Sequence, residues 1–328
     1  MQKPTLDLGL TSDARMRHVL QIASLAQSPG VHGIWIGEDI GRGLDVFVQA
    51  SMLLLRSFVK NIGIGVTSPM LRNISTLARA AAAISEIDPA RFRLGLGVGG
   101  LQDLARLGLT VEKPVAMLKE TIDVLRRIWT GETLTMRGEG FELRHFIARY
   151  KPSSGIPLYL GVRGPQLLRL AGRVADGVIL SGPLGYIEKA LETVRAEAIA
   201  RPLRTRLRTV VWLPTLVVRK KADKDLARVV AATVIADTPP AVLEMGRIPD
   251  SDVKNVREKA RERNYTRASR QVSDELLDKF LVSGDATRIA EVLRSLGKLG
   301  ADEVVFGPPY GADMVRSIRE VIGAWERL

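Results

Sequence analysis

The chain has 328 residues, of which 46% are hydrophobic and 26% are charged. This composition is typical of a globular protein and excludes a disordered or fibrous chain. The sequence has no continuously apolar stretch of membrane-spanning length, and residues 1–10 lack the pattern of a signal peptide. We therefore expect no membrane span and a cytoplasmic location.

The absence of cysteine and the scarcity of histidine limit the chemistry of the chain. The sequence contains no cysteine, which excludes disulfides, thiolate nucleophiles and cysteine-ligated metal centres. Its three histidines, His18, His32 and His145, do not have the spacing of metal ligands. We expect no protein-bound metal.

The net charge of +12 has two interpretations. A surplus of Lys and Arg can attract a polyanion such as nucleic acid, or it can keep the surface solvated. The basic residues are spread along the chain, with short concentrations at 201–208 and 257–270, and few aromatic residues accompany them. This distribution favours a solvated surface over a nucleic-acid partner, with an anionic cofactor as the next interpretation.

Short apolar runs alternate with amphipathic stretches from the beginning of the chain to its end. Eight runs predict β-strands, at 5–10, 33–36, 61–66, 91–97, 157–161, 177–180, 208–217 and 302–306. Among the helical stretches between them, one has Pro114 suited to its first turn and Gly131 suited to its C-terminal end. Asp285 could cap a later helix, and the last helix presents an apolar face that starts at Met314.

This alternation predicts an α/β fold. Strands that are apolar on both faces indicate parallel strands covered by helices, and a (β/α)8 TIM barrel closes them most economically. A doubly wound open sheet is the alternative. Two insertions exceed the alternation: 133–150, expected as a hairpin around 138–140, and 237–280, a charged helical segment introduced by Pro239 and Pro240. We expect a single domain over 1–328 with these insertions.

Glycine-rich segments follow several predicted strands, where a parallel barrel places its active site. Gly97, Val98 and Gly99 follow one strand, and 161–164 follows another and precedes a helix. The second segment offers backbone N–H groups at a helix N-terminus together with Arg163, which suits a phosphate or another anion. Glycines that merely form the strand-to-helix turn explain the segment equally well.

Two further segments contain candidate site residues. Gly63 and Gly65 lie inside a strand, which suggests a bulge or an approaching ligand, although a bend of the barrel is an equal explanation. Glu38 and Asp39 end the second strand and could handle a proton. Adjacent strand residues point to opposite faces, so we expect at least one of these carboxylates to be solvated or to cap a helix.

Together these segments resemble the coenzyme F420-dependent methylenetetrahydromethanopterin reductases of the bacterial luciferase-like superfamily. The matching segments are 63–69, 91–100, 112–115, 156–165, 175–177, 229–240 and 306–313, in the order and spacing of that family. The resemblance covers nearly the whole chain. It implies a (β/α)8 barrel that transfers a hydride between reduced F420, a deazaflavin, and the methylene carbon of a tetrahydropterin.

The resemblance also implies roles for individual positions. Gly65 and Val66 match a strand bulge with a non-prolyl cis peptide behind the deazaflavin ring, and Thr67 and Ser68 match polar contacts to that ring. The loops that line the cofactor and its phosphate-bearing tail match Gly97, Val98, Gly99, Gly161, Arg163 and Gly164. Arg163, with Arg42 as a second candidate, could steer the anionic tail.

The sequence departs from this family at several positions. Asp39 stands where the family has histidine, Ser68 replaces asparagine, and Asn73 and Ile74 replace a His-Pro pair. Some members carry a glutamate in the first strand that is proposed to protonate the pterin, and Gly9 occupies the matching position here.

Glycine cannot supply the proton, so another group must do so. We predict that Glu38 or Asp39 takes this role. A different pterin, a different F420 substrate, or an alignment shift that makes Asp7 the relevant acid would also explain the departure.

Two rival functions remain at this point. The same barrel and glycine loops occur in FMN-dependent monooxygenases and flavin-linked reductases, so FMN is the alternative cofactor. A non-catalytic barrel that binds nucleic acid or a partner through its basic surface is the second rival. The superfamily resemblance also implies a homo-oligomer.

Overall fold

The computed structural model describes residues 3–201, 206–261 and 264–328. The two basic runs at 201–208 and 257–270 therefore lie partly outside the described residues.

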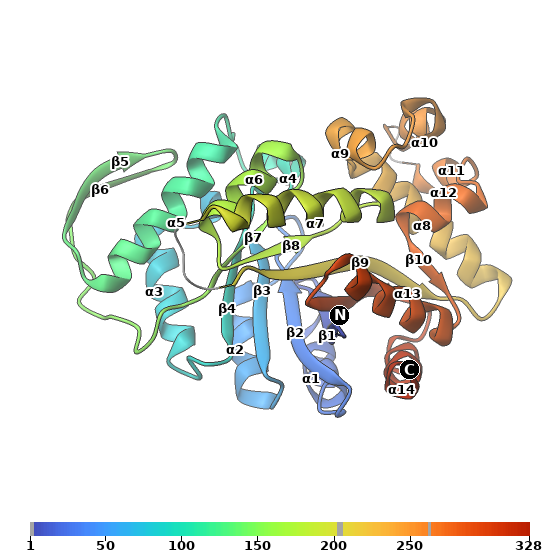
Figure 1. Ribbon diagram of the computed structural model, residues 1–328, viewed down its shortest axis with the longest axis horizontal. Helices are drawn as coiled ribbons and strands as arrows, with labels where there is room; N and C mark the ends of the chain where they lie inside the picture. Colours follow the sequence, from blue (N-terminus) through green and yellow to red (C-terminus); the bar gives the residue numbers. More distant parts are fainter. Residues whose placement is uncertain (1–2, 202–205, 262–263) are drawn as a thin grey trace.

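Parallel strands in the described part of the chain close into an eight-stranded barrel (Figure 1). Its strands are β1 (Thr5–Thr11), β2 (Val31–Gly37), β3 (Asn61–Thr67), β4 (Phe92–Leu96), β7 (Leu158–Gly161), β8 (Gly177–Leu180), β9 (Arg208–Val217) and β11 (Glu303–Tyr310). They pair in that order, and the pairings of β11 with β1 and of β8 with β9 close the circle. This closure confirms the predicted TIM barrel over the open sheet. The short β10 (Val282–Gly284) adds to the C-terminal half of β9.

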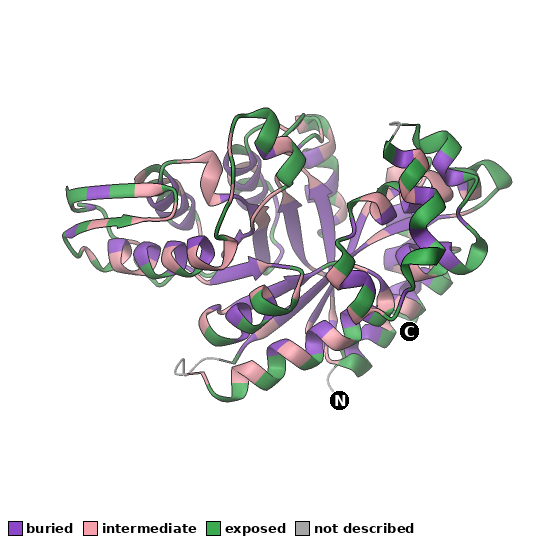
Figure 2. Ribbon diagram, turned by 90° about the horizontal axis from the view of Figure 1, so that it is seen from above, coloured by how far each residue is buried: buried purple, intermediate pink, exposed green. Residues whose placement is uncertain are grey.

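Helices cover the outside of the barrel. They are α1 (Met16–Leu25), α2 (Val46–Arg56), α3 (Ile74–Ser85), α4 (Leu101–Arg106), α5 (Pro114–Thr130), α6 (Pro165–Val174), α7 (Leu184–Ile199), α13 (Ala286–Leu299) and α14 (Met314–Arg327), with a 3₁₀ turn at Pro69–Leu71. The strands are buried, whereas the outer helix faces are exposed (Figure 2). Pro114 begins α5, Gly131 follows it with φ of 80°, and Asp285 accepts a hydrogen bond from the N–H of Arg288, so the predicted helix ends are confirmed.

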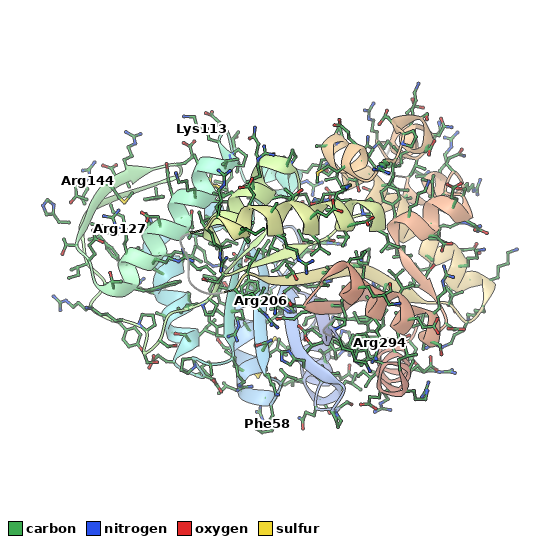
Figure 3. All side chains as sticks on the ribbon, in the orientation of Figure 1. Phe58, Lys113, Arg127, Arg144, Arg206 and Arg294 are labelled. Atoms are coloured by element: carbon green, nitrogen blue, oxygen red, sulfur yellow. The ribbon has the colours of Figure 1, made fainter. Side chains whose placement is uncertain are left out.

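Two segments extend from the barrel. Strands β5 (Leu134–Gly138) and β6 (Phe141–Phe146) form an antiparallel hairpin at the left of Figure 1, from which the exposed Arg144 points into solvent (Figure 3). The second segment contains α8 (Lys221–Asp237), α9 (Pro240–Met245), α10 (Asp250–Arg261), α11 (Tyr265–Ser269) and α12 (Asp274–Phe280). Its apolar side chains form a cluster of their own around Ala231, Val253 and Leu277. Within the described residues, no helix is both long and apolar enough to span a membrane.

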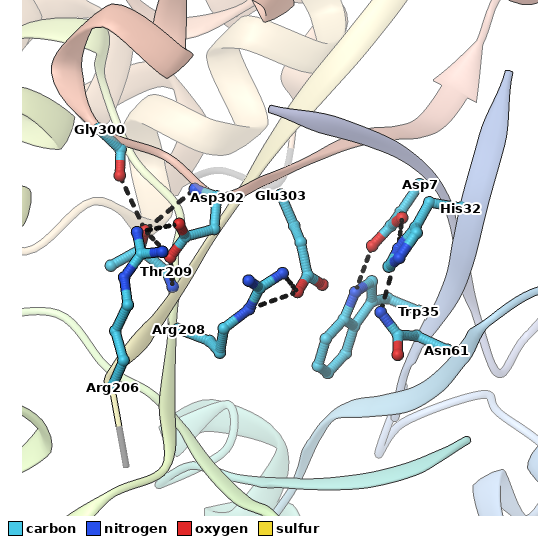
Figure 4. A network of polar contacts seen from close by, with 10 residues as sticks. All are labelled: Asp7, His32, Trp35, Asn61, Arg206, Arg208, Thr209, Gly300, Asp302 and Glu303. Carbon is cyan, nitrogen blue, oxygen red and sulfur yellow. Dashed lines mark hydrogen bonds and ion pairs between the residues drawn. The ribbon is translucent and has the colours of Figure 1, made fainter. Parts of the chain in front are cut away.

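The interior of the barrel changes character from its N-terminal to its C-terminal end. Near the N-terminal end Arg208 donates to Glu303 at 2.9 Å, and the indole N–H of Trp35 donates to Asp7 at 2.9 Å (Figure 4). The middle is apolar and is filled by Trp35, Tyr159, Ile179, Val210 and Val305. Glycines line the C-terminal end, where Trp212 and Val66 pack against several of them.

Candidate functional site

A bulge at the end of β3 shapes the C-terminal mouth of the barrel. The peptide bond between Gly65 and Val66 is cis, and the pairing of β3 with β4 shifts register between Ile64 and Thr67. Both features were predicted at these positions and are confirmed. Val66 is half-buried, so its backbone and part of its side chain face the mouth.

The side chain of Val66 explains two of the predicted cofactor-lining glycines. A Cβ added to Gly161 would lie 2.4 Å from Val66 Cγ1, and one added to Gly97 would lie 2.6 Å from Val66 Cγ2. Real side chains do not approach this closely. Gly97 and Gly161 therefore form the notch in which Val66 is held, and any contact that they make with a cofactor comes in addition to this packing.

Gly161→Ala is expected to lower the free energy of unfolding by about 1–3 kcal/mol, because the new methyl group overlaps Val66. Val66→Ala removes the overlapping groups, so the double variant should recover much of the loss. Urea unfolding of the wild type, both single variants and the double variant measures this coupling. Gly155→Ala is the matched control, because nothing lies within 4 Å of its added Cβ. Additive losses in the double variant would contradict the proposed notch.

The hydroxyl groups of Thr67 and Ser68 are bonded within the protein. Thr67 Oγ1 donates to Glu38 Oε2 at 2.6 Å, and Ser68 Oγ donates to the carbonyl of Val98 at 2.8 Å. Both residues are buried. The backbone of Thr67 and Ser68 can therefore contact a cofactor ring more readily than their hydroxyl groups can. The predicted contact of these residues with the ring stays a prediction.

Glu38 lies in a network of charged groups at the end of β2. Arg72 donates to Glu38 Oε1 at 2.9 Å through one nitrogen and to Asp45 Oδ2 at 2.8 Å through another. The guanidinium also lies 4.6 Å from the ring centroid of Phe47. Burial raises the pKa of Asp45, but hydrogen bonds from Arg72 and from the N-terminal amides of α2 outweigh it and lower the pKa below its usual range. The network fixes the Glu38 carboxyl group beside Thr67.

Asp39 is bonded to its own loop. Its Oδ1 accepts hydrogen bonds from the N–H groups of Gly41 and Arg42, at 3.0 and 2.8 Å, and its own N–H donates to Ser12 Oγ. The side chain of Arg42 is 81% exposed and lies 3.6 Å from Asp39. Glu38 and Asp39 were both predicted to handle a proton. The hydrogen bonds of Asp39 show that its side chain stabilises the turn at 39–42.

The loop after β7 leads directly into the N-terminus of α6. Gly164 has φ of 95°, and nothing lies within 4 Å of a Cβ added to it, so this position opens onto free space. Arg163 donates to Asp237 Oδ2 at 3.0 Å and is 37% exposed. Gly99, in the facing loop after β4, has φ of 89°, a conformation that favours glycine. The N-terminus of α6, an arginine and the open space at Gly164 fit the phosphate-bearing tail of a cofactor such as F420.

The positions that depart from the family pattern have structural explanations. Asn73 caps α3 by accepting from the N–H of Ser75 at 3.0 Å. A Cβ added to Gly9 would lie 2.7 Å from Cζ2 of Trp212, so the indole occupies the space that a side chain on β1 would need. Asp7, the alternative acid, is fully buried one layer below Gly9 and is bonded to Trp35, away from the mouth.

Sequence reasoning missed three residues that the structure places at the mouth. Arg72 follows the 3₁₀ turn after β3 and pairs with Glu38, although 34 residues separate them. Asp237 partners Arg163 from the end of α8. Trp212 lies on β9 among apolar neighbours and reads as a core residue. The sequence feature that could have identified Trp212 is a large aromatic residue on a strand of a barrel whose neighbouring strands carry several glycines.

Comparisons with known proteins agree on the family. The model of the luciferase-like monooxygenase family matches residues 3–303. A protein named 5,10-methylenetetrahydromethanopterin reductase from Archaeoglobus fulgidus is 33% identical over 305 residues, 90% of this chain and 90% of that protein. A protein named F420-dependent glucose-6-phosphate dehydrogenase from Nakamurella multipartita is 27% identical over 80% of this chain and 78% of that protein.

The fold is also shared with a solved structure. The coenzyme F420 dependent tetrahydromethanopterin reductase from Methanopyrus kandleri superposes with a TM-score of 0.87 at 20% identity, over 99% of both chains. The family model and the 33% identity to the Archaeoglobus fulgidus protein confirm the family expected from the segments in the sequence. With a family model that matches nearly its whole length, the chain belongs to the luciferase-like monooxygenase family.

Proposed function

We propose that this protein is an F420-dependent oxidoreductase that transfers a hydride between reduced F420 and N5,N10-methylenetetrahydromethanopterin or a related pterin that carries a one-carbon unit. The observation that carries the proposal is the 33% identity, over 90% of both chains, to a protein named for this reaction. The bulge at Gly65 and Val66 supports it, since it lies at the barrel mouth where the family holds its deazaflavin.

F420 would supply the hydride, while the chain would hold two flat molecules in contact and exclude water. The half-buried Val66 and the backbone around it would support one face of the cofactor ring. The N-terminus of α6, with open space at Gly164, and the neighbouring Arg163 would hold its anionic tail.

Opening of the methylene bridge needs a proton at a pterin nitrogen. We assign the handling of this proton to Glu38, because its carboxyl group ends β2 next to the bulge and is positioned by Thr67 and Arg72. Asp39 would position the loop, since its carboxyl oxygen already accepts two backbone hydrogen bonds.

Arg163→Ala should weaken F420 binding by about 3- to 10-fold, because it removes a cation beside the open loop. Asp237→Asn should act in the opposite direction, since Asp237 neutralises Arg163 in the ion pair at 3.0 Å. Both effects should shrink at high salt. Fluorescence titrations with F420 measure them, and Arg144→Ala on the exposed hairpin is the control. Equal affinities in all variants would place the tail elsewhere.

The proposal is tested by titrating the purified protein with F420 and, separately, with FMN, and then adding methylenetetrahydromethanopterin to the complex with reduced F420. Tight F420 binding with oxidation of reduced F420 supports the reductase. Reduction of oxidised F420 by glucose 6-phosphate, in place of oxidation of reduced F420 by the pterin, would shift the substrate to that of the dehydrogenase relatives. FMN binding with oxygen consumption would favour the monooxygenase alternative.

A homo-oligomer and a cytoplasmic location complete the proposal. Both come from the family and from the sequence, and light scattering of the purified protein measures the first. Steep salt-dependent binding of DNA or RNA without affinity for F420 or FMN would instead support the basic, non-catalytic barrel.

A further inference from the structure

Trp212 extends across the C-terminal end of the barrel interior. It lies on β9, yet its ring contacts glycines on the neighbouring strand β11 and on strands beyond it. A Cβ added to Gly307 on β11 would lie 2.2 Å from Trp212 Nε1, and one added to Gly9 on β1 would lie 2.7 Å from Cζ2. At Gly65 on β3 the corresponding distance is 3.4 Å, to Cζ3, an ordinary contact. The indole therefore spans the bore from β11 to β3.

Glycine is required where this ring passes closest. At Gly9 and Gly307 any side chain would overlap the indole, because the added Cβ would come nearer than real atoms do. Glycine inside a strand weakens it, so such glycines mark places where something must approach the backbone. Here the approaching group is Trp212, and the mouth is shaped to hold this one large ring.

Part of Trp212 remains accessible. The residue is half-buried, whereas its apolar neighbours Val210 and Val305 inside the barrel are fully buried. Its indole N–H has no hydrogen-bond partner among the described residues and is not fully enclosed by protein. The ring also lies next to Gly65, the first residue of the cis peptide, since Cζ3 is 3.4 Å from a Cβ added there.

We propose that Trp212 is the aromatic floor of the reaction site, on which a flat heterocyclic ring stacks while the indole N–H is available to a polar edge of that ligand. The inference rests on the proposed function, which supplies two flat rings, the deazaflavin of F420 and the pterin. An aromatic floor suits such rings, because a flat π-system laid on the indole gains from offset stacking. Trp212 thus acts as a specificity-determining residue.

Trp212→Leu, which removes the ring but keeps an apolar side chain, tests the floor. Calorimetric titrations with F420 and with tetrahydromethanopterin, run separately and without turnover, should show one of them bound about 10- to 100-fold more weakly. The ligand affected identifies which ring lies on the indole. Trp212→Phe should retain most of the affinity. Trp129→Leu is the control, because Trp129 lies on α5 and donates to the carbonyl of Ala78.

A second measurement uses the unaltered fold. The chain has four tryptophans, so 5-fluorotryptophan labelling gives a small set of ¹⁹F signals that single Trp→Phe variants assign. F420 or tetrahydromethanopterin should shift the Trp212 signal and leave those of Trp129 and Trp325 in place. Unchanged affinities in Trp212→Leu for both ligands, or a Trp212 signal that neither ligand moves, would overturn the floor. If F420 or tetrahydromethanopterin bound and shifted the Trp212 signal without turnover, the proposed reaction would be wrong, whereas the assignment of Trp212 as the aromatic floor would still hold.

Discussion

Glu38→Gln is expected to lower kcat for F420-dependent pterin reduction by about 10²- to 10⁴-fold, the usual contribution of a general acid or base. The amide oxygen of glutamine can still accept from Arg72, and its amide nitrogen can donate to Thr67, so the network that holds residue 38 should persist. Glutamine cannot take up or release the proton. Steady-state kinetics measure the loss of proton transfer. The dissociation constant of F420, measured in parallel, shows whether cofactor binding is preserved.

Asp39→Asn is the matched control for this variant. Asparagine keeps the carbonyl oxygen that accepts from Gly41 and Arg42, so the loop and the activity should both survive. If Glu38→Gln retained wild-type kcat and an unchanged pH profile, Glu38 would be a positioning residue only. If Asp39→Asn were the inactive variant, the assignment of the two carboxylates would be reversed.

The free energy of unfolding is expected to fall as the pH rises from 4.5 to 7, because of Glu303. Burial, followed by the nearby Asp7 carboxylate, raises the pKa of Glu303 to about 7, and the hydrogen bond from Arg208 offsets these effects only in part. In the unfolded chain the same group titrates near 4.5. The folded state therefore binds the proton more tightly over this interval.

The sign of the effect follows from that difference. The stabilisation is fully present below about pH 4.5, where both states are protonated, and it is lost as the pH rises through about 7. Glu303→Gln cannot titrate, so its stability should lack this component. Urea unfolding of both proteins at intervals from pH 4.5 to 8 measures the difference curve. Parallel curves for wild type and variant would show that folding leaves the pKa of Glu303 unshifted.

The sequence was sufficient to predict the barrel because each strand is a short apolar run between helices with local end signals such as Pro114 and Asp285. Local patterns also located the bulge at Gly65 and Val66. The three-residue β10 was missed, since so short a run carries no periodicity. The features predicted correctly from the sequence, such as strands, helix ends and the bulge, are thus mostly those that residues close in the chain determine.

The chemistry of the site depends on contacts between distant segments, which a single sequence does not reveal. Gly97 and Gly161 were predicted from the family to line a cofactor, but their nearest neighbour is Val66, which β3 delivers from elsewhere in the chain. Glu38 was identified as a carboxylate, while its partner Arg72 was not. Likewise the loss of an acid at Gly9 was visible, but the indole of Trp212 that fills its place was not.

The contact between Gly9 and Trp212 also constrains the order in which this site can change during evolution. An acidic side chain at position 9 overlaps the indole, so a chain that carries Trp212 cannot first gain the acid without disrupting the barrel mouth. A Cβ at position 9 would also lie 2.8 Å from Val305 Cγ1, so replacement of the indole alone does not free this space. Gain of an acid at position 9 therefore requires coordinated changes on β1, β9 and β11.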